Sequence, residues 1–334
     1  NFNSAIPGNT ITCATQTLGE VKFNGLGGEW TLQDQLSCYN FNIVYGTFYS
    51  NNQTINCSNF YAGSPFNTFA YLGTSTINCS AWWGYPSFTA PSIDADSTVI
   101  NTSYDFMGGD NAYHYVNFPN GGNLADRNTF DKVTANSSMN ISGSNTFDTL
   151  DINIPGMIVL LNPNDTQFVV NSLIANGTCA NLISISGGNI SKASGNVTAN
   201  YLLMQDLNAI GGANFTANNS VVISNVTGWN VTSPSAQNLY WVGNTGNWND
   251  PMHWATSSGG PGGSCTPTLF DNVFFDANSF STANDTVYVN VNQGYCKNMD
   301  WTGAANNPVF IFPTTSASFN IYGSLTLPPS MSFV

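Results

Sequence analysis

Three tetrads near the start of the chain carry the strongest structural signal: Thr10-Ile11-Thr12-Cys13, Thr54-Ile55-Asn56-Cys57 and Thr76-Ile77-Asn78-Cys79. Their cysteines are 44 and then 22 residues apart, so the first interval is twice the second. The skipped step holds Thr31-Leu32-Gln33-Asp34, and one step further stands Thr98-Val99-Ile100-Asn101, with asparagine in place of the cysteine. A repeat of this length is typical of one coil of a β-solenoid.

The rest of the chain has little helical periodicity. Gly, Pro and Asn interrupt it every few residues and leave short apolar–polar alternations, which predict short strands. We therefore predict an all-β chain that forms a right-handed parallel β-solenoid, with equivalent strands stacked about 4.8 Å apart. One apolar column is expected to contain Ile11, Ile55, Ile77 and Val99, with Cys13, Cys57, Cys79 and Asn101 on the opposite face.

The cysteines allow two interpretations. Stacked neighbours such as Cys57 and Cys79 either bond to each other or remain reduced as small fillers, and reduced fillers are the simpler interpretation. The pattern does not decide whether Cys13, Cys38, Cys57 and Cys79 are oxidised. Seven cysteines in the chain indicate export to an oxidising compartment, and their odd number leaves at least one outside any internal pair.

The composition excludes two classes of partner. Charged residues make up 7% of the chain, against about 25% in an ordinary globular protein. Five cations against 18 acidic residues give a net charge of −13, and the cations are scattered, which excludes a basic patch for nucleic acid. No apolar run approaches the roughly 18–20 residues of a membrane span.

A second segment begins near residue 238. We divide the chain into a solenoid over 1–237, a Trp/Gly-rich β segment over 238–305, and the start of further solenoid coils over 306–334. Cys265 and Cys296 bracket two strand-like stretches of the middle segment, and a disulfide between them is the pairing we expect. The tryptophans Trp241, Trp248 and Trp254 form either a local core, the interpretation we favour, or a platform for sugars.

Both ends of the chain are apolar and carry no polar cap. Open solenoid coils expose unpaired strand edges, so something must cover them. We expect the next copy to do so, either as a separate subunit or as a covalent repeat, in a head-to-tail contact that generates a filament. The residues expected at this contact are Phe2, Ile6, Met331, Phe333 and Val334.

Several stretches resemble very large secreted proteins of gliding bacteria. They include Gly28-Glu29-Trp30-Thr31-Leu32-Gln33-Asp34, the Thr-Ile-Asn-Cys tetrads, Tyr240-Trp241-Val242-Gly243 and Cys296-Lys297-Asn298-Met299-Asp300-Trp301-Thr302-Gly303. Those proteins are adhesin-like, are built of β-helical repeats and usually carry a C-terminal sorting domain, which this chain lacks. The resemblance implies that the chain is an internal repeat unit or a trimmed protomer, exported to the cell surface with a structural or adhesive role.

Sugar attachment is a further expectation. Sequons of the Asn-x-Ser/Thr type give the candidates Asn52, Asn101, Asn136, Asn164, Asn176, Asn196, Asn218 and Asn284. Bacteria of the resembled kind also attach O-linked sugar beside Asp, which implies Thr149 and Thr286, with Ser97 as the poorer match.

The sequence lacks the signature of an enzyme. Asp94 and Asp96 are the nearest approach to paired carboxylates, and no nucleophile, His-Glu-x-x-His or metal-ligand motif is present. We expect no cofactor, although acidic turns such as those at Asp271 and Asp276 could hold calcium. The function expected is therefore a structural subunit of an extracellular filament. The alternative is a carbohydrate-binding adhesin module that uses Trp82, Trp83 or the aromatics of 241–254, and a polysaccharide-degrading β-helix enzyme is the third choice.

Overall fold

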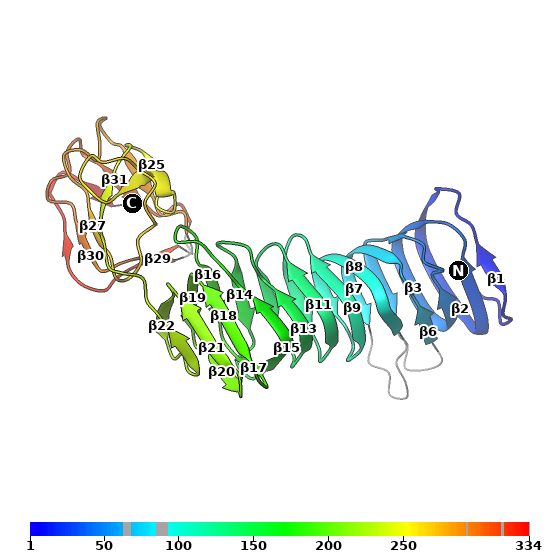
Figure 1. Ribbon diagram of the computed structural model, residues 1–334. Coiled ribbons are helices and arrows are strands. Elements are labelled where there is room, and N and C mark those ends of the chain that lie inside the picture. The colour runs from blue at the N-terminus through cyan, green and yellow to red at the C-terminus, as the bar shows by residue number, and fades with distance from the viewer. Residues whose placement is uncertain (63–67, 85–92, 292, 315–316, 334) are drawn as a thin grey trace.

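The apolar–polar alternation of the sequence becomes a stack of parallel coils in a computed structural model that describes residues 1–62, 68–84, 93–291, 293–314 and 317–333. The chain forms a β-solenoid of about 14 turns, which runs as a long rod from the N-terminal coils to a smaller C-terminal unit (Figure 1). Strands of the solenoid pair in parallel, coil upon coil. The predicted all-β solenoid is confirmed.

A 20-stranded sheet bends around the coils and a 3-stranded sheet completes the last ones. The solenoid strands are β1 (Asn9–Ile11), β2 (Thr17–Leu32), β3 (Leu36–Tyr49), β4 (Ile55–Asn56), β5 (Asn59–Ala62), β6 (Thr68–Tyr71), β7 (Thr76–Gly84), β8 (Ile93–Met107), β9 (Ala112–Phe118), β10 (Gly122–Ala125), β11 (Thr129–Ala135), β12 (Met139–Ile141), β13 (Thr146–Asp151), β14 (Ile158–Leu161), β15 (Thr166–Ile174), β16 (Ile183–Ser186), β17 (Asn189–Lys192), β18 (Asn196–Asn200), β19 (Leu202–Gln205), β20 (Asn208–Gly211), β21 (Asn214–Asn218), β22 (Val221–Ser224) and β23 (Trp229–Val231).

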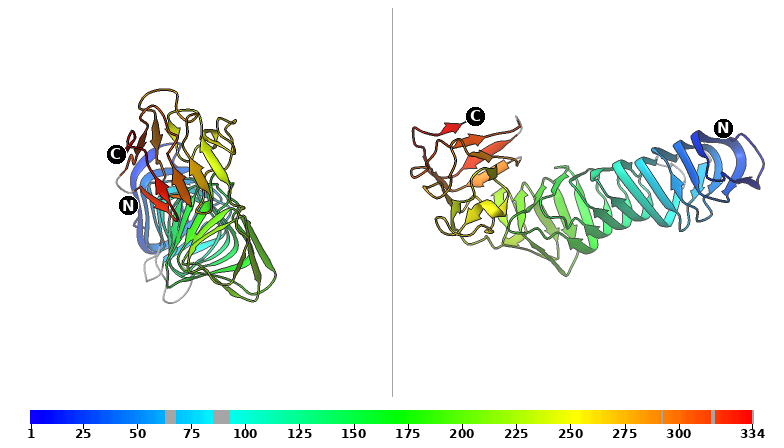
Figure 2. Two further views of the ribbon diagram at one scale, coloured as in Figure 1. Left: turned by 90° about the vertical axis from the view of Figure 1, so that its left-hand side faces the viewer. Right: turned by 90° about the horizontal axis from the view of Figure 1, so that it is seen from above.

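The C-terminal unit is a shorter stack of its own, set at an angle to the solenoid (Figure 2). Its elements are β24 (Asn238–Trp241), β25 (Gly246–Asn247), the 3-10 helix η1 (Pro251–His253), β26 (Trp254–Ala255), β27 (Asn272–Phe274), β28 (Thr286–Tyr288), β29 (Gln293–Cys296), β30 (Asn298–Asp300), β31 (Val309–Ile311), β32 (Ser318–Ile321), β33 (Leu325–Thr326) and β34 (Ser332–Phe333). The strands of 309–333 pair with β28, β29, β30 and β31, so they continue the same sheets.

One apolar column of the solenoid passes through Leu36, Ile55, Ile77 and Ile100. The cysteines were expected on the opposite face from this column, and this was wrong: Ile77 and Cys79 are both buried, because residues two apart in a strand share a face. The expected membership of the column was also wrong at two places. Ile100 rather than Val99 follows Ile77, so Thr102 takes the cysteine position, and Ile11 pairs with Leu32 on another part of the coil. Hydrogen-bond register rather than a constant number of residues aligns the coils, because the turns between strands absorb extra residues.

Aromatic rings fill the first half of the core. Phe41, Phe60 and Trp82 occupy equivalent positions on successive coils, with ring centroids 4.6 and 4.2 Å apart. Phe106 extends this stack 5.8 Å beyond Trp82, and all four rings are fully buried. Stacked aromatic pairs contribute about 0.5–1.5 kcal/mol each beyond the burial of their surface. The rings therefore fix the register of neighbouring coils as well as fill space.

Asparagine ladders run along the rod. The Nδ2 atoms of Asn78, Asn101 and Asn117 donate to the Oδ1 atom of the asparagine one coil earlier, at 2.8, 2.8 and 3.1 Å; the first acceptor is Asn56. A second ladder joins Asn153, Asn176, Asn200 and Asn218. Each amide both donates and accepts, so stacked asparagines satisfy one another without charge. This explains how so few ionised groups suffice for a long rod.

The corner near Gly143 shows how tightly the coils approach. Gly143 has a φ of +75°, and a Cβ atom built there would lie 1.8 Å from the Asp126 carbonyl oxygen. Beside it, the buried Asn145 side chain accepts a hydrogen bond from the Asn128 backbone N–H at 3.0 Å. Only glycine fits both the backbone conformation and the space at this corner.

The C-terminal unit has a separate core that is rich in tryptophan and phenylalanine. Trp241, Trp248, Trp254 and Trp301 are at most 2% exposed, and the indole N–H groups of Trp241 and Trp254 donate to backbone carbonyls at 2.7 and 2.8 Å. The favoured interpretation of the 241–254 tryptophans as a local core is confirmed. Among the described residues, no helix has the length and apolar character needed to cross a membrane.

Candidate functional site

A cleft of about 610 Å³ lies where the C-terminal unit faces the outer surface of the last solenoid coils. One wall is formed by outward-facing residues of β14, β16, β19 and β22. The other wall is formed by segments around Trp248, Thr268 and Tyr295 of the C-terminal unit. Figure 1 shows β29 of that unit close to β16. The volume lies within the range of about 300–1,000 Å³ that is usual for ligand sites, and such sites favour the boundary between two structural units.

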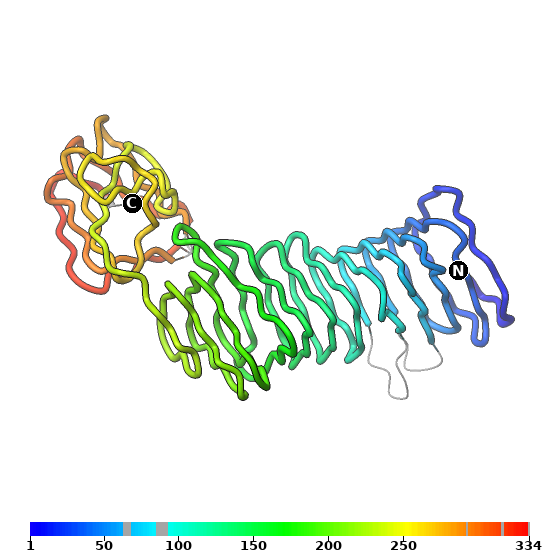
Figure 3. The backbone as a smooth tube through the Cα atoms, viewed as in Figure 1, coloured from blue at the N-terminus to red at the C-terminus, as the bar shows by residue number. Residues whose placement is uncertain are grey.

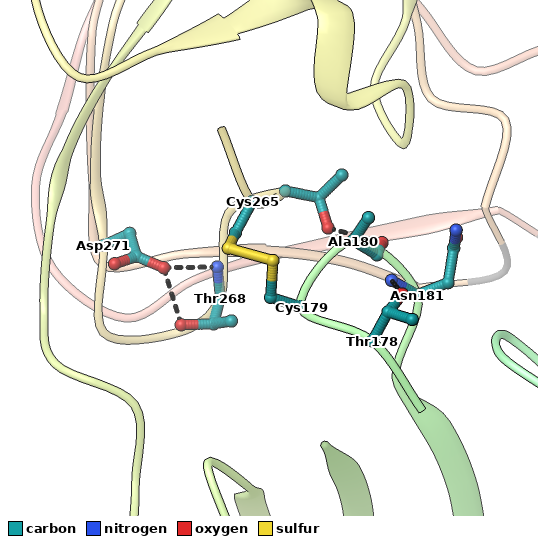
Figure 4. Close-up of a disulfide and its surroundings, with 8 residues drawn as sticks. Thr178, Cys179, Ala180, Asn181, Cys265, Thr268 and Asp271 are labelled. Carbon is teal, nitrogen blue, oxygen red and sulfur yellow. Dashed lines mark hydrogen bonds between the residues drawn. A yellow bond between two sulfur atoms is a disulfide. The ribbon is translucent and has the colours of Figure 1, made fainter. Parts of the chain in front are cut away.

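A disulfide holds the two walls together. Cys179, in the turn before β16, is bonded to Cys265 of the C-terminal unit, with their Cα atoms 5.1 Å apart (Figure 4). Next to it the Thr266 hydroxyl donates to the Ala180 carbonyl oxygen at 2.8 Å. The buried Asp271 carboxylate accepts hydrogen bonds from the backbone N–H and the hydroxyl of Thr268, both at 2.7 Å (Figure 4). These contacts hold in place the segment of the C-terminal unit that forms the second wall of the cleft.

This disulfide corrects the pairing that we expected. Cys265 bonds to Cys179, whereas Cys296 is a free thiol, fully buried in the core of the C-terminal unit. We expected Cys265 and Cys296 to be close together because they flank two strand-like stretches. An alternation of apolar and polar residues predicts strands, but it does not show which coil faces which loop. Cys179 lies 86 residues before Cys265, and only the folding-back of the C-terminal unit brings them together.

Cys38, Cys57 and Cys79 lie in register on three successive coils. The residues that precede them are paired across the coils, Ser37 with Asn56 and Asn56 with Asn78. Each cysteine directly follows one of these residues. All three are free thiols and line one shallow surface depression. Burial raises the pKa of Cys38 and of Cys79 to about 12 and also raises that of Cys57. The thiols are thus protonated at neutral pH, in agreement with the interpretation of reduced fillers.

The aromatic residues named for sugar binding do not form a platform. Trp82 is a core residue with no exposed surface, which excludes it from contact with a sugar. Trp83 lies half-buried on the outer face with its ring parallel to that of Tyr61, 6.2 Å away. Tyr49 and Tyr71 likewise stack at 5.0 Å. Rings stacked along the rod axis cover each other's faces, and those are the surfaces that a sugar needs.

The acidic candidates are dispersed. Asp94 and Asp96 are exposed on the same side of β8, whereas Asp271 and Asp276 lie in turns of the C-terminal unit. Asp271 accepts three hydrogen bonds from the chain, from Gln237 and Thr268, and an Asp276 oxygen accepts the Asn278 N–H. In the part of the chain that the structure describes, no group of three or more His, Cys, Asp or Glu residues is arranged to hold a metal ion.

The candidate glycosylation sites fall into two groups by environment. Members of asparagine ladders engage their amide groups with neighbouring coils; these are Asn101, Asn136, Asn176, Asn196 and Asn218. The exposed turn residues are Asn52, Asn164 and Asn284, and Ser97 is also exposed. Thr149 and Thr286 are half-buried, with hydroxyl groups that donate to Asp148 and to the Asn284 carbonyl. Sugar on any of them stays a prediction, and the exposed residues are the more accessible.

The residues expected at the ends of the rod have different surroundings. Phe2 stacks on Phe23 with ring centroids 5.0 Å apart, and Ile6 is 66% exposed. Met331 is partly buried against the core of the C-terminal unit, and Phe333 pairs through its backbone with Phe310. Val334 lies outside the described residues.

Searches for related proteins give no further guidance: neither a family model, nor a curated protein, nor a solved structure matches the chain.

The sequence alone did not indicate the position of the cleft. Its solenoid wall contains Ile158, Leu160 and Leu203, which alternate with buried residues and therefore face outward. Apolar residues in the outward positions of a strand were the available signal. The sequence does not show which coils face the C-terminal unit, so outward apolar residues alone do not identify the site.

Proposed function

We propose that the chain is a structural unit of an extracellular fibre and performs no catalysis. The observation that carries this proposal is the parallel stack of about 14 turns, in which asparagine ladders on the outer face add side-chain hydrogen bonds to the backbone pairing of the coils. A rod of this kind gives length and stiffness to the fibre that it forms. The Cys179–Cys265 disulfide fits an oxidising compartment, and the resemblance to secreted β-helical repeat proteins points in the same direction.

The first coil offers a surface for extension. The Ile11 carbonyl oxygen accepts the Gln33 N–H at 2.8 Å, so this residue faces β2. Alternate residues of a strand direct their backbone groups to opposite sides, and Thr10 therefore presents its N–H and C=O to the outside. One face of the Phe2 ring covers Phe23, and Ile6 is largely exposed. We assign the layer that covers this edge to a further copy of the same unit, separate or covalently joined.

A substitution at the edge tests the assembly. Thr10→Pro removes the outward N–H without loss of a bond to β2, so we expect it to abolish head-to-tail association. Thr10→Val keeps the N–H and serves as the matched control. Sedimentation velocity and negative-stain imaging of the concentrated chain should show fibres for the wild type and the control, and monomers for Thr10→Pro. A wild-type chain that remains monomeric at millimolar concentration, or a proline variant that still assembles, contradicts the proposal.

A further inference from the structure

The outer face of one solenoid sheet changes character where it enters the cleft. On the coils before the cleft, its outward positions hold polar residues such as Asn123 and Asn140. On the coils that line the cleft, this row continues through Leu160, Ser186 and Gln205. The neighbouring row of the same face holds Ile158, Ser184 and Leu203, so aliphatic and polar side chains alternate there. Leu160 remains 47% exposed although the C-terminal unit faces it. Packing between the two units therefore does not bury this apolar surface.

Uncharged polar groups accompany this apolar surface. Ser184, Ser186, Asn249 and Asn290 line the cleft, and within the described residues their side chains have no hydrogen-bond partner in the chain. None of the described lining residues is acidic, basic or histidine. The cleft therefore combines aliphatic patches with hydroxyl and carboxamide groups that are free to bind a ligand.

We propose that this cleft binds a neutral oligosaccharide. A hexose presents C–H faces that cover aliphatic side chains and hydroxyls that pair with serine and asparagine. A charged ligand would lose its hydration in the cleft without a counter-charge to replace it. A wholly apolar ligand would leave the serine and asparagine groups unpaired.

The backbone of the solenoid wall excludes a peptide that binds by adding a strand to it. A peptide that adds a strand needs a free sheet edge, because its affinity comes from main-chain hydrogen bonds. The strands β14, β16, β19 and β22 pair successively with one another and present the face of their sheet to the cleft. The cleft thus recognises its ligand through side chains. This inference concerns a site on the side of the rod and does not rest on fibre assembly.

Isothermal titration calorimetry on the intact chain tests the inference. The probes are cellohexaose, laminarihexaose, maltohexaose and mannohexaose, with tri-galacturonate as the charged comparison. Ser186→Trp fills the cleft from its solenoid wall. We expect at least one neutral probe to bind the wild type and its dissociation constant to increase by about tenfold or more in Ser186→Trp.

Val170→Trp is the matched control, because Val170 is a 61% exposed residue of β15 that does not line the cleft. We expect it to bind the probe as the wild type does, and circular dichroism should show that both variants are folded. The proposal is overturned if none of the neutral probes binds, if Ser186→Trp binds like the wild type, or if tri-galacturonate binds as tightly as the best neutral probe.

Discussion

Cys38, Cys57 and Cys79 illustrate how burial sets the chemistry of a residue in this protein. They lie on neighbouring coils, about 4.8 Å apart along the stack, a separation that a disulfide tolerates. Nevertheless they are free thiols with raised pKa values, and the first cause is the loss of hydration of the thiolate. A protonated thiol is a poor nucleophile, so proximity alone does not lead to oxidation.

The cysteines make a prediction about alkaline stability. The pKa of Cys79 rises from 9.0 to about 12 on folding. Between these values the unfolded chain releases the proton while the folded chain retains it, so the free energy of unfolding falls as the pH rises above about 9. The slope for one such thiol approaches about 1.4 kcal/mol per pH unit, and below pH 9 the thiol contributes no pH dependence.

Urea titrations at a series of pH values from 7 to 11 measure this slope. We expect Cys79→Ser to reduce it. Thr102→Ser, one coil later, should leave it unchanged, because serine keeps the hydroxyl group that hydrogen-bonds to Cys79. Some slope should remain in both variants, because burial also raises the pKa of Cys38, Cys296 and Tyr295 to about 12 and raises that of Cys57. Equal slopes for Cys79→Ser and the wild type would show that the thiol ionises as freely in the folded chain as in the unfolded one.

At the scale of elements, the asparagine ladders take the place that ion pairs occupy on other proteins. Asn78 donates to Asn56 and accepts from Asn101, both at 2.8 Å, and all three are half-buried. A ladder of amides pays no desolvation cost for charge and is insensitive to salt. It also specifies register, because a slip by one residue would place each amide opposite an apolar side chain.

We expect Asn78→Ala to lower the free energy of unfolding by about 1–2 kcal/mol, because it removes two hydrogen bonds and leaves two amides with one partner fewer. Asn164→Ala is the control, since Asn164 lies exposed in a turn outside the ladders. Its effect should stay within about 0.5 kcal/mol. Urea titration measures the free energy of unfolding of both variants. If Asn78→Ala is as stable as the control, the ladder does not contribute to stability.

At the scale of the whole molecule, one disulfide determines how the C-terminal unit lies against the solenoid. The two units have separate cores, which end at Val231 and begin at Leu239. Figure 3 shows the backbone passing from the last solenoid coils into the C-terminal unit. Cys179–Cys265 and the Thr266 hydrogen bond to Ala180 link them on the cleft side. Interfaces between units of one chain are often mobile, so the covalent link is the principal restraint on the cleft width.

The double variant Cys179→Ser/Cys265→Ser tests this restraint. Opening a loop of 86 residues removes about 4.6 kcal/mol of stabilisation by chain entropy. We expect the far-ultraviolet circular dichroism to stay unchanged, because each unit keeps its core, while small-angle X-ray scattering shows a larger and more variable radius of gyration. Cys296→Ser, which removes a free buried thiol, is the control. Identical scattering curves for the double variant and the wild type would mean that noncovalent contacts alone set the cleft.

The sequence by itself determined the class of fold and most of the local structure. Tetrads that recur at a fixed period, and short alternations broken by glycine and asparagine, are local signals, and they sufficed for a parallel solenoid and for a tryptophan core near the C-terminus. They did not fix the register, since turns of different length shift Ile100 into the place expected for Val99. They also left Trp82 assigned to the surface in one alternative, although its neighbours Phe60 and Phe106 bury it.

Only the tertiary structure decided the disulfide and the cleft. Both depend on residues far apart in the chain: Cys179 meets Cys265, and Leu160 faces the segment of Tyr295. A solenoid coil contacts chiefly its neighbours, so its sequence encodes the stacking of adjacent coils. The way in which the C-terminal unit folds back depends on the sum of all intervening turns, and no local pattern carries that information.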